Sequence, residues 1–183
     1  MRLLPLLFLL LATPALAQSK PDPRRAELDA MLTALKAAPN EQAAATLEAR
    51  IRERWLQAGS AAATLLMGRG MRDLQSDSAN EAVDDFDAVL VLEPDYADAY
   101  HRRAMARFAL GDYPGALADI EATLQREPRD FAALKTLSQI AESRDDYKGA
   151  LAAWQKVLEL SPHTPDGAER LKELQKKVLG EES

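Results

Sequence analysis

Apolar residues recur at intervals of three and four along most of this chain, with polar and charged residues between them. In the stretch 115–126, Leu117, Ile120 and Leu124 fall on one side of a helix, which is the pattern of a helix that buries one face. Short breaks rich in glycine, proline and aspartate, such as the one at 111–114, interrupt these stretches. The pattern therefore predicts a succession of amphipathic helices joined by short turns.

The helices and breaks repeat with a period of 34 residues. Pro94, Pro128 and Pro162 mark the ends of three successive copies at that spacing. Further columns align at the same step: Ala82, Ala116 and Ala150; Phe86, Ile120 and Trp154; Leu90, Leu124 and Leu158; Leu66, Tyr100 and Leu134; Gly70, Ala104 and Ser138. A fixed period of this length is typical of a repeat architecture in which each copy is one structural unit.

The aligned columns indicate how two antiparallel helices pack within each copy. Helices approach to about 8–10 Å only where the side chains between them allow it, so a bulky residue at Ala104 or Ala116 would push the pair apart. The column Phe86, Ile120 and Trp154 would fill the space where one copy meets the next. A proline ends each pair, because proline cannot continue a helix.

The sequence at the turns resembles the tetratricopeptide repeat (TPR). The motifs are Gly-Asp-Tyr-Pro-Gly-Ala-Leu at 111–117, Arg-Asp-Asp-Tyr-Lys-Gly-Ala-Leu at 144–151, and Glu-Pro at 93–94 and 127–128. The resemblance implies an all-α fold, a right-handed TPR α-solenoid of antiparallel helix pairs, with copies at 61–96, 97–130 and 131–164. The first copy departs most: Ser78-Ala79 replaces Asp-Tyr in the turn, and Asp73 stands where the family usually has an aromatic residue. The motif therefore leaves the turn of this copy in doubt.

The flanking segments are predicted to be helical caps, because the end units of a solenoid need atypical outer faces. Residues 18–60 suggest a divergent helical hairpin, with Pro39-Asn40 as the break. Its apolar stripes are Leu28, Met31, Leu32 and Leu35, and Leu47, Ile51 and Trp55. Residues 165–179 suggest a C-terminal capping helix that covers the open edge of the third copy, and residues 180–183 are expected to fray.

The N-terminus has the three-part layout of a cleavable signal peptide at residues 1–17. Met1-Arg2 is positive, residues 3–12 are almost wholly apolar, and Ala15-Leu16-Ala17 is a small-x-small cleavage site. The apolar run is about half of the roughly 20 residues that span a bilayer, which disfavours the alternative, an uncleaved anchor. The chain has no cysteine, which excludes disulfides and lipid attachment. We expect a periplasmic protein without stable membrane insertion, with secretion as the alternative.

The charge balance and the lack of a catalytic constellation argue against two classes of function, nucleic-acid binding and catalysis. With 23 Lys+Arg and 29 Asp+Glu the net charge is −6, which argues against a nucleic-acid partner. His101 and His163 stand alone, and without cysteine a zinc site is improbable, so we expect no metal, no cofactor and no enzyme. The acidic residues Asp84, Asp85 and Asp87 are interpreted as a solvated helix face.

What remains is the concave groove that the resemblance implies, lined in this family by the first helix of each pair. Carried over by alignment, the partner-binding residues would be Met67, Met71, His101, Met105, Phe108, Lys135, Gln139 and Glu142. Methionine suits adaptable binding surfaces, yet Met67, Met71 and Met105 fit ordinary packing equally well. For His101 the alternatives are a pH-sensing contact and an uninvolved surface residue, and we expect the second. The clamp for a C-terminal carboxylate found in chaperone-binding TPR proteins is not reproduced, because Met67 and Met71 occupy two of its places.

The sequence thus predicts a non-catalytic adaptor or scaffold of the bacterial cell envelope that binds a protein partner, as a peptide or helix in the groove. Two alternatives stay open. The chain could be a self-associating structural module, or an accessory subunit of an envelope assembly complex.

Overall fold

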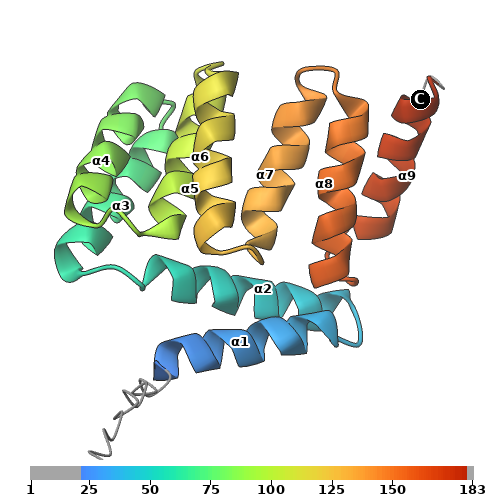
Figure 1. The fold of residues 1–183 in the computed structure, drawn as a ribbon, viewed down its shortest axis with the longest axis horizontal. Coiled ribbons are helices and arrows are strands. Elements are labelled where there is room, and N and C mark those ends of the chain that lie inside the picture. The colour runs from blue at the N-terminus through green and yellow to red at the C-terminus, as the bar shows by residue number, and fades with distance from the viewer. Residues whose placement is uncertain (1–21, 181–183) are drawn as a thin grey trace, which may run out of the picture.

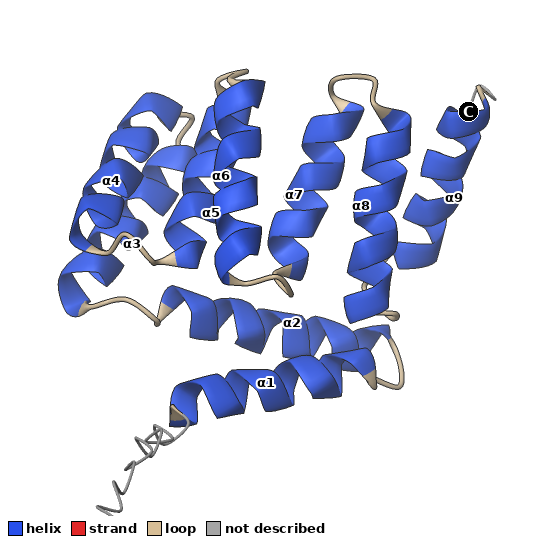
Figure 2. Ribbon diagram, viewed as in Figure 1, coloured by secondary structure: helices blue, strands red, loops and turns tan. Residues whose placement is uncertain are grey.

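The computed structural model describes residues 22–180, and within that range it consists of nine helices and no strand (Figures 1 and 2). The predicted leader lies outside the described residues. The helices are α1 (Pro23–Lys36), α2 (Glu41–Leu56), α3 (Ala61–Gln75), α4 (Ala79–Leu92), α5 (Ala97–Ala109), α6 (Tyr113–Arg126), α7 (Phe131–Glu142), α8 (Tyr147–Leu160) and α9 (Gly167–Leu179). None of them is long and apolar enough to cross a membrane.

Helices α3 to α8 form three antiparallel pairs that stand side by side, and we call them the repeat array (Figure 1). Each pair is joined by the same turn, in which one residue is left-handed: Asp77, Gly111 and Asp145, with φ of 58°, 78° and 59°. The next amide donates to a carbonyl five residues back, over 2.9 Å in all three copies, which is a Schellman ending. The turn of the first copy, left in doubt by its sequence, therefore has the geometry of the other two.

The Asp-x-x-Gly of the second and third turns has a direct structural reason. The carboxylates of Asp112 and Asp146 cap α6 and α8 by accepting from the amides of Gly115 and Gly149, over 3.0 and 2.9 Å. Each carboxylate folds so closely over its glycine that a Cβ there would collide with it. Ser78, the equivalent residue of the first copy, makes no such side-chain bond.

Small residues let the helices of each pair approach, as their columns predicted. Ala104, Ala116 and Ala150 are completely buried. A Cβ on Gly70 would lie only 2.8 Å from Cε1 of Phe86. The large column fills the space beside them, with Phe86 and Ile120 at the centres of two apolar clusters.

Helix α9 closes the C-terminal edge of the array, which confirms the predicted cap. Leu174 is fully buried in a cluster with Trp154 and Val157 of α8. The indole Nε1 of Trp154 also donates to the carbonyl of Gly167, over 3.0 Å, at the start of the capping helix.

We define the hairpin as α1 and α2. It does not cover the N-terminal edge of the array, where a terminal cap was expected. It runs across the ends of the array helices, on the side of the loops that join one repeat to the next (Figure 1). Helix α2 packs against α5, and α1 against α8. As a result Leu65, on α3, is 72% exposed, whereas Ala99 and Ala133 in the same column are fully buried by the preceding repeat.

Ion pairs between the helices of a pair follow the repeat as well. Arg69 pairs with Asp85 in the first copy and Arg103 with Asp119 in the second, 16 residues apart in each case. In the third copy the two places are taken by Leu137 and an alanine. Our interpretation of the acidic segment 84–87 as a solvated face is wrong for Asp85, whose carboxylate is buried in this pair.

Candidate functional site

A cavity of about 650 Å³, which we call the groove cavity, is lined by the third repeat, by Phe108 of α5 and by the start of the capping helix. It brings together four of the residues predicted for partner binding. Its lining residues are Phe108, Lys135, Ser138, Gln139, Glu142, Ser143, Trp154, Pro165, Asp166 and Arg170.

Phe108 in this cavity and Met105, on the same helix, are apolar side chains that remain partly exposed. Phe108 is half-buried, and its ring lies 5.9 Å from that of Tyr113, centroid to centroid. Met105, one turn earlier on α5, is also half-buried, with its sulfur 4.0 Å from Nη1 of Arg102. Gln139 of α7, which also lines the cavity, is exposed. An adaptable apolar surface with a polar rim is suited to a peptide or helix.

Glu142 lines the groove cavity but does not offer a free charge. Its carboxylate accepts from the guanidinium of Arg170 and, over 2.5 Å, from the Lys177 ammonium, both on α9. The hydrogen bond from Arg170 is the main reason why the pKa of Glu142 is lowered. Its principal role is to hold the capping helix in place.

Three other predicted residues lie deeper than a groove surface would allow. Met67 is fully buried and Met71 half-buried, and both pack in the core of the first repeat. His101 is 3% exposed, with Nε2 3.0 Å from Oγ1 of Thr136, so the expectation of a surface histidine is wrong. Burial, aided by the nearby Arg102 charge, lowers the pKa of His101 to about 3. The imidazole is therefore neutral at physiological pH, and neither it nor Met67 can touch a partner in this arrangement.

Lys135 is engaged by the hairpin. Its Nζ donates to Oε2 of Glu48, on α2, over 2.8 Å, and to Oγ1 of Thr164 over 2.7 Å. The other carboxylate oxygen accepts from the hydroxyls of Ser161 and Thr164, over 2.9 and 2.7 Å. We call Lys135, Ser161 and Thr164 the receptor. Burial raises the pKa of Glu48, but the hydrogen bonds and charge of the receptor outweigh it and leave that pKa lowered, so the carboxylate is ionised.

Sequence reasoning missed Glu48, although a signal was present. It is a single acidic residue on the apolar face of α2, in register with Ala44, Ile51 and Trp55, all of which are buried. A buried carboxylate requires partners, so its place on this face indicated a polar contact with another element.

An aromatic contact lies beside the receptor. The rings of Trp55 and Phe131, the first residue of α7, lie 5.2 Å apart. The guanidinium of Arg52 and the ammonium of Lys135 lie over the same Phe131 ring, at 5.8 and 5.5 Å. Phe131 is fully buried, so this contact anchors the hairpin to the third repeat.

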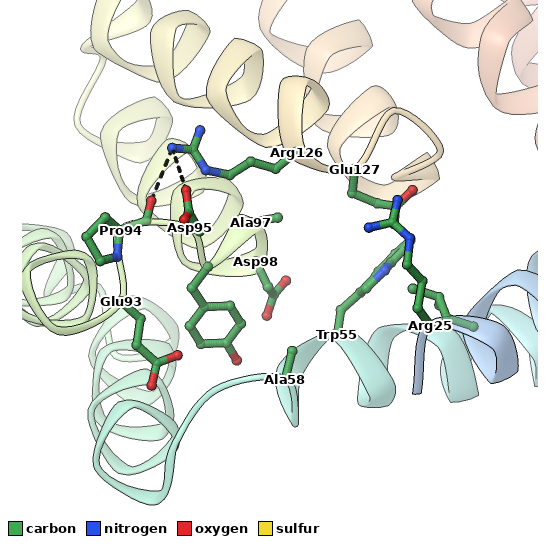
Figure 3. Close-up of a pocket in the computed structure, with 12 residues that line it drawn as sticks. Arg25, Trp55, Ala58, Glu93, Pro94, Asp95, Ala97, Asp98, Arg126 and Glu127 are labelled. Carbon is green, nitrogen blue, oxygen red and sulfur yellow. Dashed lines mark hydrogen bonds and ion pairs between the residues drawn. The ribbon is translucent and has the colours of Figure 1, made fainter. Parts of the chain in front are cut away.

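A second cavity, of about 530 Å³, separates the hairpin from the second repeat (Figure 3). Trp55 and Arg25 line it on the hairpin side, and Asp98, Arg126 and Glu127 on the array side. The indole Nε1 of Trp55 is buried and has no hydrogen-bond partner in the described part of the protein. The interface between the hairpin and the second repeat is therefore incompletely packed at this point.

The described residues offer no group of histidine and carboxylate side chains able to hold a metal ion. The buried titratable residues at the hairpin interface, such as Asp98 and Asp130, are taken up by contacts within the fold. The carboxylate of Asp98 accepts from Arg102 at 3.4 Å, and that of Asp130 caps α7 through the amide of Ala133 at 2.9 Å.

Relatives define the class of protein. No family model matches the chain. A TPR repeat-containing protein of Rhizobium etli is 30% identical over 164 residues, which are 90% of this chain and 79% of the relative. The chain therefore belongs to the tetratricopeptide-repeat family. Protein FlbA of Caulobacter vibrioides is 46% identical over a shorter stretch of 52 residues, 27% of this chain and 9% of that protein.

Solved structures agree on the fold. The first TPR domain of RPAP3 (Spaghetti), bound to the HSP90 peptide SRMEEVD, matches with a TM-score of 0.62 at 19% identity, over 66% of this chain and 96% of that one. The TPR domain of Sgt2 from Aspergillus fumigatus has a TM-score of 0.62 at 23% identity, over 67% and 82%. At these identities the likeness shows the fold alone, and the fold is the predicted all-α TPR solenoid, an architecture used for protein interaction.

Proposed function

We propose that this chain is a non-catalytic adaptor of the bacterial cell envelope that binds a peptide or helix of a partner protein in the groove cavity. The observation that carries the proposal is Phe108, a partly exposed apolar side chain that lines an open cavity of about 650 Å³, with Met105 partly exposed one turn earlier on the same helix. Exposed apolar residues that converge on a concave surface mark interaction sites more often than chance positions do. The peptide-bound RPAP3 domain lends support by fold.

The double variant Met105→Glu, Phe108→Glu tests the groove. We expect it to keep its helical circular dichroism and to lose the proteins that crosslink to the wild-type chain in a pull-down from the native envelope. The matched control is Val91→Glu, Leu92→Glu, which places two glutamates on exposed apolar positions of α4. Unfolding of the groove variant would show that the two side chains are core, and retained partners would place binding elsewhere.

The envelope location is supported by the leader-like sequence of residues 1–17. Fractionation of a Gram-negative host that expresses the full chain tests it. We expect the protein in the periplasmic fraction at a mass reduced by the leader, and a variant without residues 2–17 in the cytoplasm. A full-length product in the cytoplasmic fraction would contradict the location.

Self-association is the second candidate, favoured by the uncovered face of α3. Leu65 is exposed there, at a position that is buried in both later repeats. Sedimentation of the purified chain separates the two candidates. A stable dimer that Leu65→Glu dissociates supports the structural module, and a monomer supports the adaptor.

A further inference from the structure

The receptor on the third repeat is a built site for a carboxylate. Lys135 contributes from α7, and Ser161 and Thr164 from the segment between α8 and α9. Together they give the Glu48 carboxylate one ammonium and two hydroxyl donors within 2.9 Å. All three receptor residues belong to the array side, and the hairpin supplies the ligand.

We infer that this receptor is exchangeable: a helix of a partner protein that carries a carboxylate, with an aromatic residue seven positions later, displaces the hairpin and takes its place. The inference rests on the proposed function, since it requires that the chain bind a segment of another protein. It adds the chemistry of that segment and a means of regulation, because the hairpin competes with the partner for the receptor.

The hairpin is attached in a way that permits exchange. It is not a layer of the solenoid, and the chain joins it to α3 only through residues 57–60. Its contact with the second repeat leaves a cavity of about 530 Å³ and an indole N–H of Trp55 that is unpaired within residues 22–180. Its ion pair between Asp29 and Arg129 is half-exposed, with side-chain exposures of 48% and 38%, and pairs of this kind add little stability. The Glu48 carboxylate is thus the buried polar tie between the hairpin and the third repeat, beside the apolar contact of Trp55 with Phe131.

Charge selects an acidic occupant. When the hairpin leaves, Lys135 loses Glu48 and Arg129 loses Asp29, so the vacated surface presents two cations beside the ring of Phe131. A partner without a carboxylate would cover the Lys135 ammonium and leave it without a counter-ion, which is costly. Helix α2 shows the required spacing: Glu48 and Trp55 lie two turns apart on one face.

The inference is tested with a labelled synthetic peptide of residues 22–58, which contains the hairpin, added to the full chain. The linked hairpin of the wild-type chain competes at a high effective concentration, so we expect weak binding. The variant Glu48→Lys places an ammonium against Lys135 and releases the hairpin. Fluorescence anisotropy should show at least about tenfold tighter peptide binding to this variant than to the wild-type chain.

Matched controls test whether the Glu48 carboxylate itself is responsible for peptide binding. A peptide with Glu48→Gln should bind the released chain at least about tenfold more weakly, whereas a peptide with Glu53→Gln, changed at an exposed position of α2, should bind like the wild-type sequence. The chain variant Lys135→Gln should release its hairpin yet fail to bind the peptide. Hydrogen exchange reports release directly, as faster exchange in 23–56 with protection kept in 61–179.

Several results would overturn the inference. One is a Glu48→Lys chain whose hairpin amides stay protected from hydrogen exchange. Another is equal affinity of the chain for the wild-type peptide and for the peptide with Glu48→Gln. A third is loss of amide protection throughout the array, which would make the hairpin integral to the fold. A hairpin-exchanged dimer of the variant in sedimentation would make a second copy the occupant and would also overturn it. The Met105→Glu, Phe108→Glu chain retains the receptor, so failure of the groove test and failure of this one are separate results.

Discussion

In the repeat array each helix packs on the next one along the chain, whereas Glu48 of the hairpin binds residues 87 to 116 positions away. The array contacts are largely apolar and repeat every 34 residues, with alanines and glycines that let helices nest. The hairpin contact combines an apolar cluster around Phe131, one buried carboxylate, one half-exposed ion pair and a cavity. Neighbour-to-neighbour packing makes an array cooperative over its whole length. A docked element held by a few distant contacts can open by itself.

The largest expected effect comes from removing a large core side chain of the array. Phe86 is fully buried between α3 and α4. Replacing it with alanine should lower the free energy of unfolding by about 4 kcal/mol, through lost transfer energy and a cavity. The whole array should unfold at lower urea in a single transition followed by circular dichroism. Val91→Ala, at an exposed position of the same helix, is the control and should change little. A Phe86→Ala loss below about 1 kcal/mol would contradict cooperative packing.

The equivalent substitution in the hairpin should destabilise only the docking of the hairpin. Trp55→Ala removes the ring that packs on Phe131, which should weaken hairpin docking by about 3 kcal/mol. Amide exchange should accelerate across 23–56, while the urea midpoint of the array stays nearly unchanged. Arg50→Ala, exposed on the same helix, is the matched control. A shift of the array midpoint as large as that of Phe86→Ala would remove the distinction between the two regions.

Asp130, at the start of α7 between the two regions, predicts a pH dependence. Burial, with the Asp98 and Glu127 charges nearby, raises its pKa from 3.8 to about 7. The folded state therefore holds a proton that the unfolded state releases, so this stability is present below pH 4 and is lost as pH rises through 7. Asn keeps the helix cap without the charge. At pH 8 Asp130→Asn should be more stable than wild type, on the order of 1 to 3 kcal/mol.

Urea titrations at pH 5 and pH 8 measure this effect. The gain of Asp130→Asn over the wild-type chain should be smaller at pH 5, where Asp130 is already protonated. The control Asp95→Asn changes an almost fully exposed carboxylate and should give the same small difference at both values. A gain that does not grow with pH would mean that Asp130 stays ionised in the folded state.

The array was predictable because its determinants lie close together in sequence. Alanine columns, Asp-x-x-Gly caps and inter-repeat prolines each act within one or two helices. The sequence of a single copy is therefore enough to predict the structure of that copy. The turn at Asp77 shows the reverse case: its left-handed geometry matches that of Gly111, although the motif is absent, since aspartate also tolerates this conformation.

The position of the hairpin was not predictable in this way. Its two apolar stripes indicated helices but not which surface they cover, and an end cap was the simplest assumption. The groove list failed in part for a related reason. Helical spacing assigned Met67 and Lys135 equivalent places on α3 and α7, yet Met67 is core and Lys135 binds Glu48. Only tertiary contacts distinguish them.

The smallest expected effect tests the consequence of that displaced hairpin. Leu65, Ala99 and Ala133 occupy one column, but within residues 22–180 only Leu65 has no preceding repeat against it, and it is 72% exposed. Leu65→Glu should therefore change the free energy of unfolding by less than about 0.5 kcal/mol. The same change in the next repeat, Ala99→Glu, would bury a charge against α4 and should cost several-fold more. Urea denaturation at a protein concentration where the chain is monomeric measures both. If Leu65→Glu were as damaging as Ala99→Glu, the first repeat would have to be covered in solution, and the hairpin would be the element that covers it.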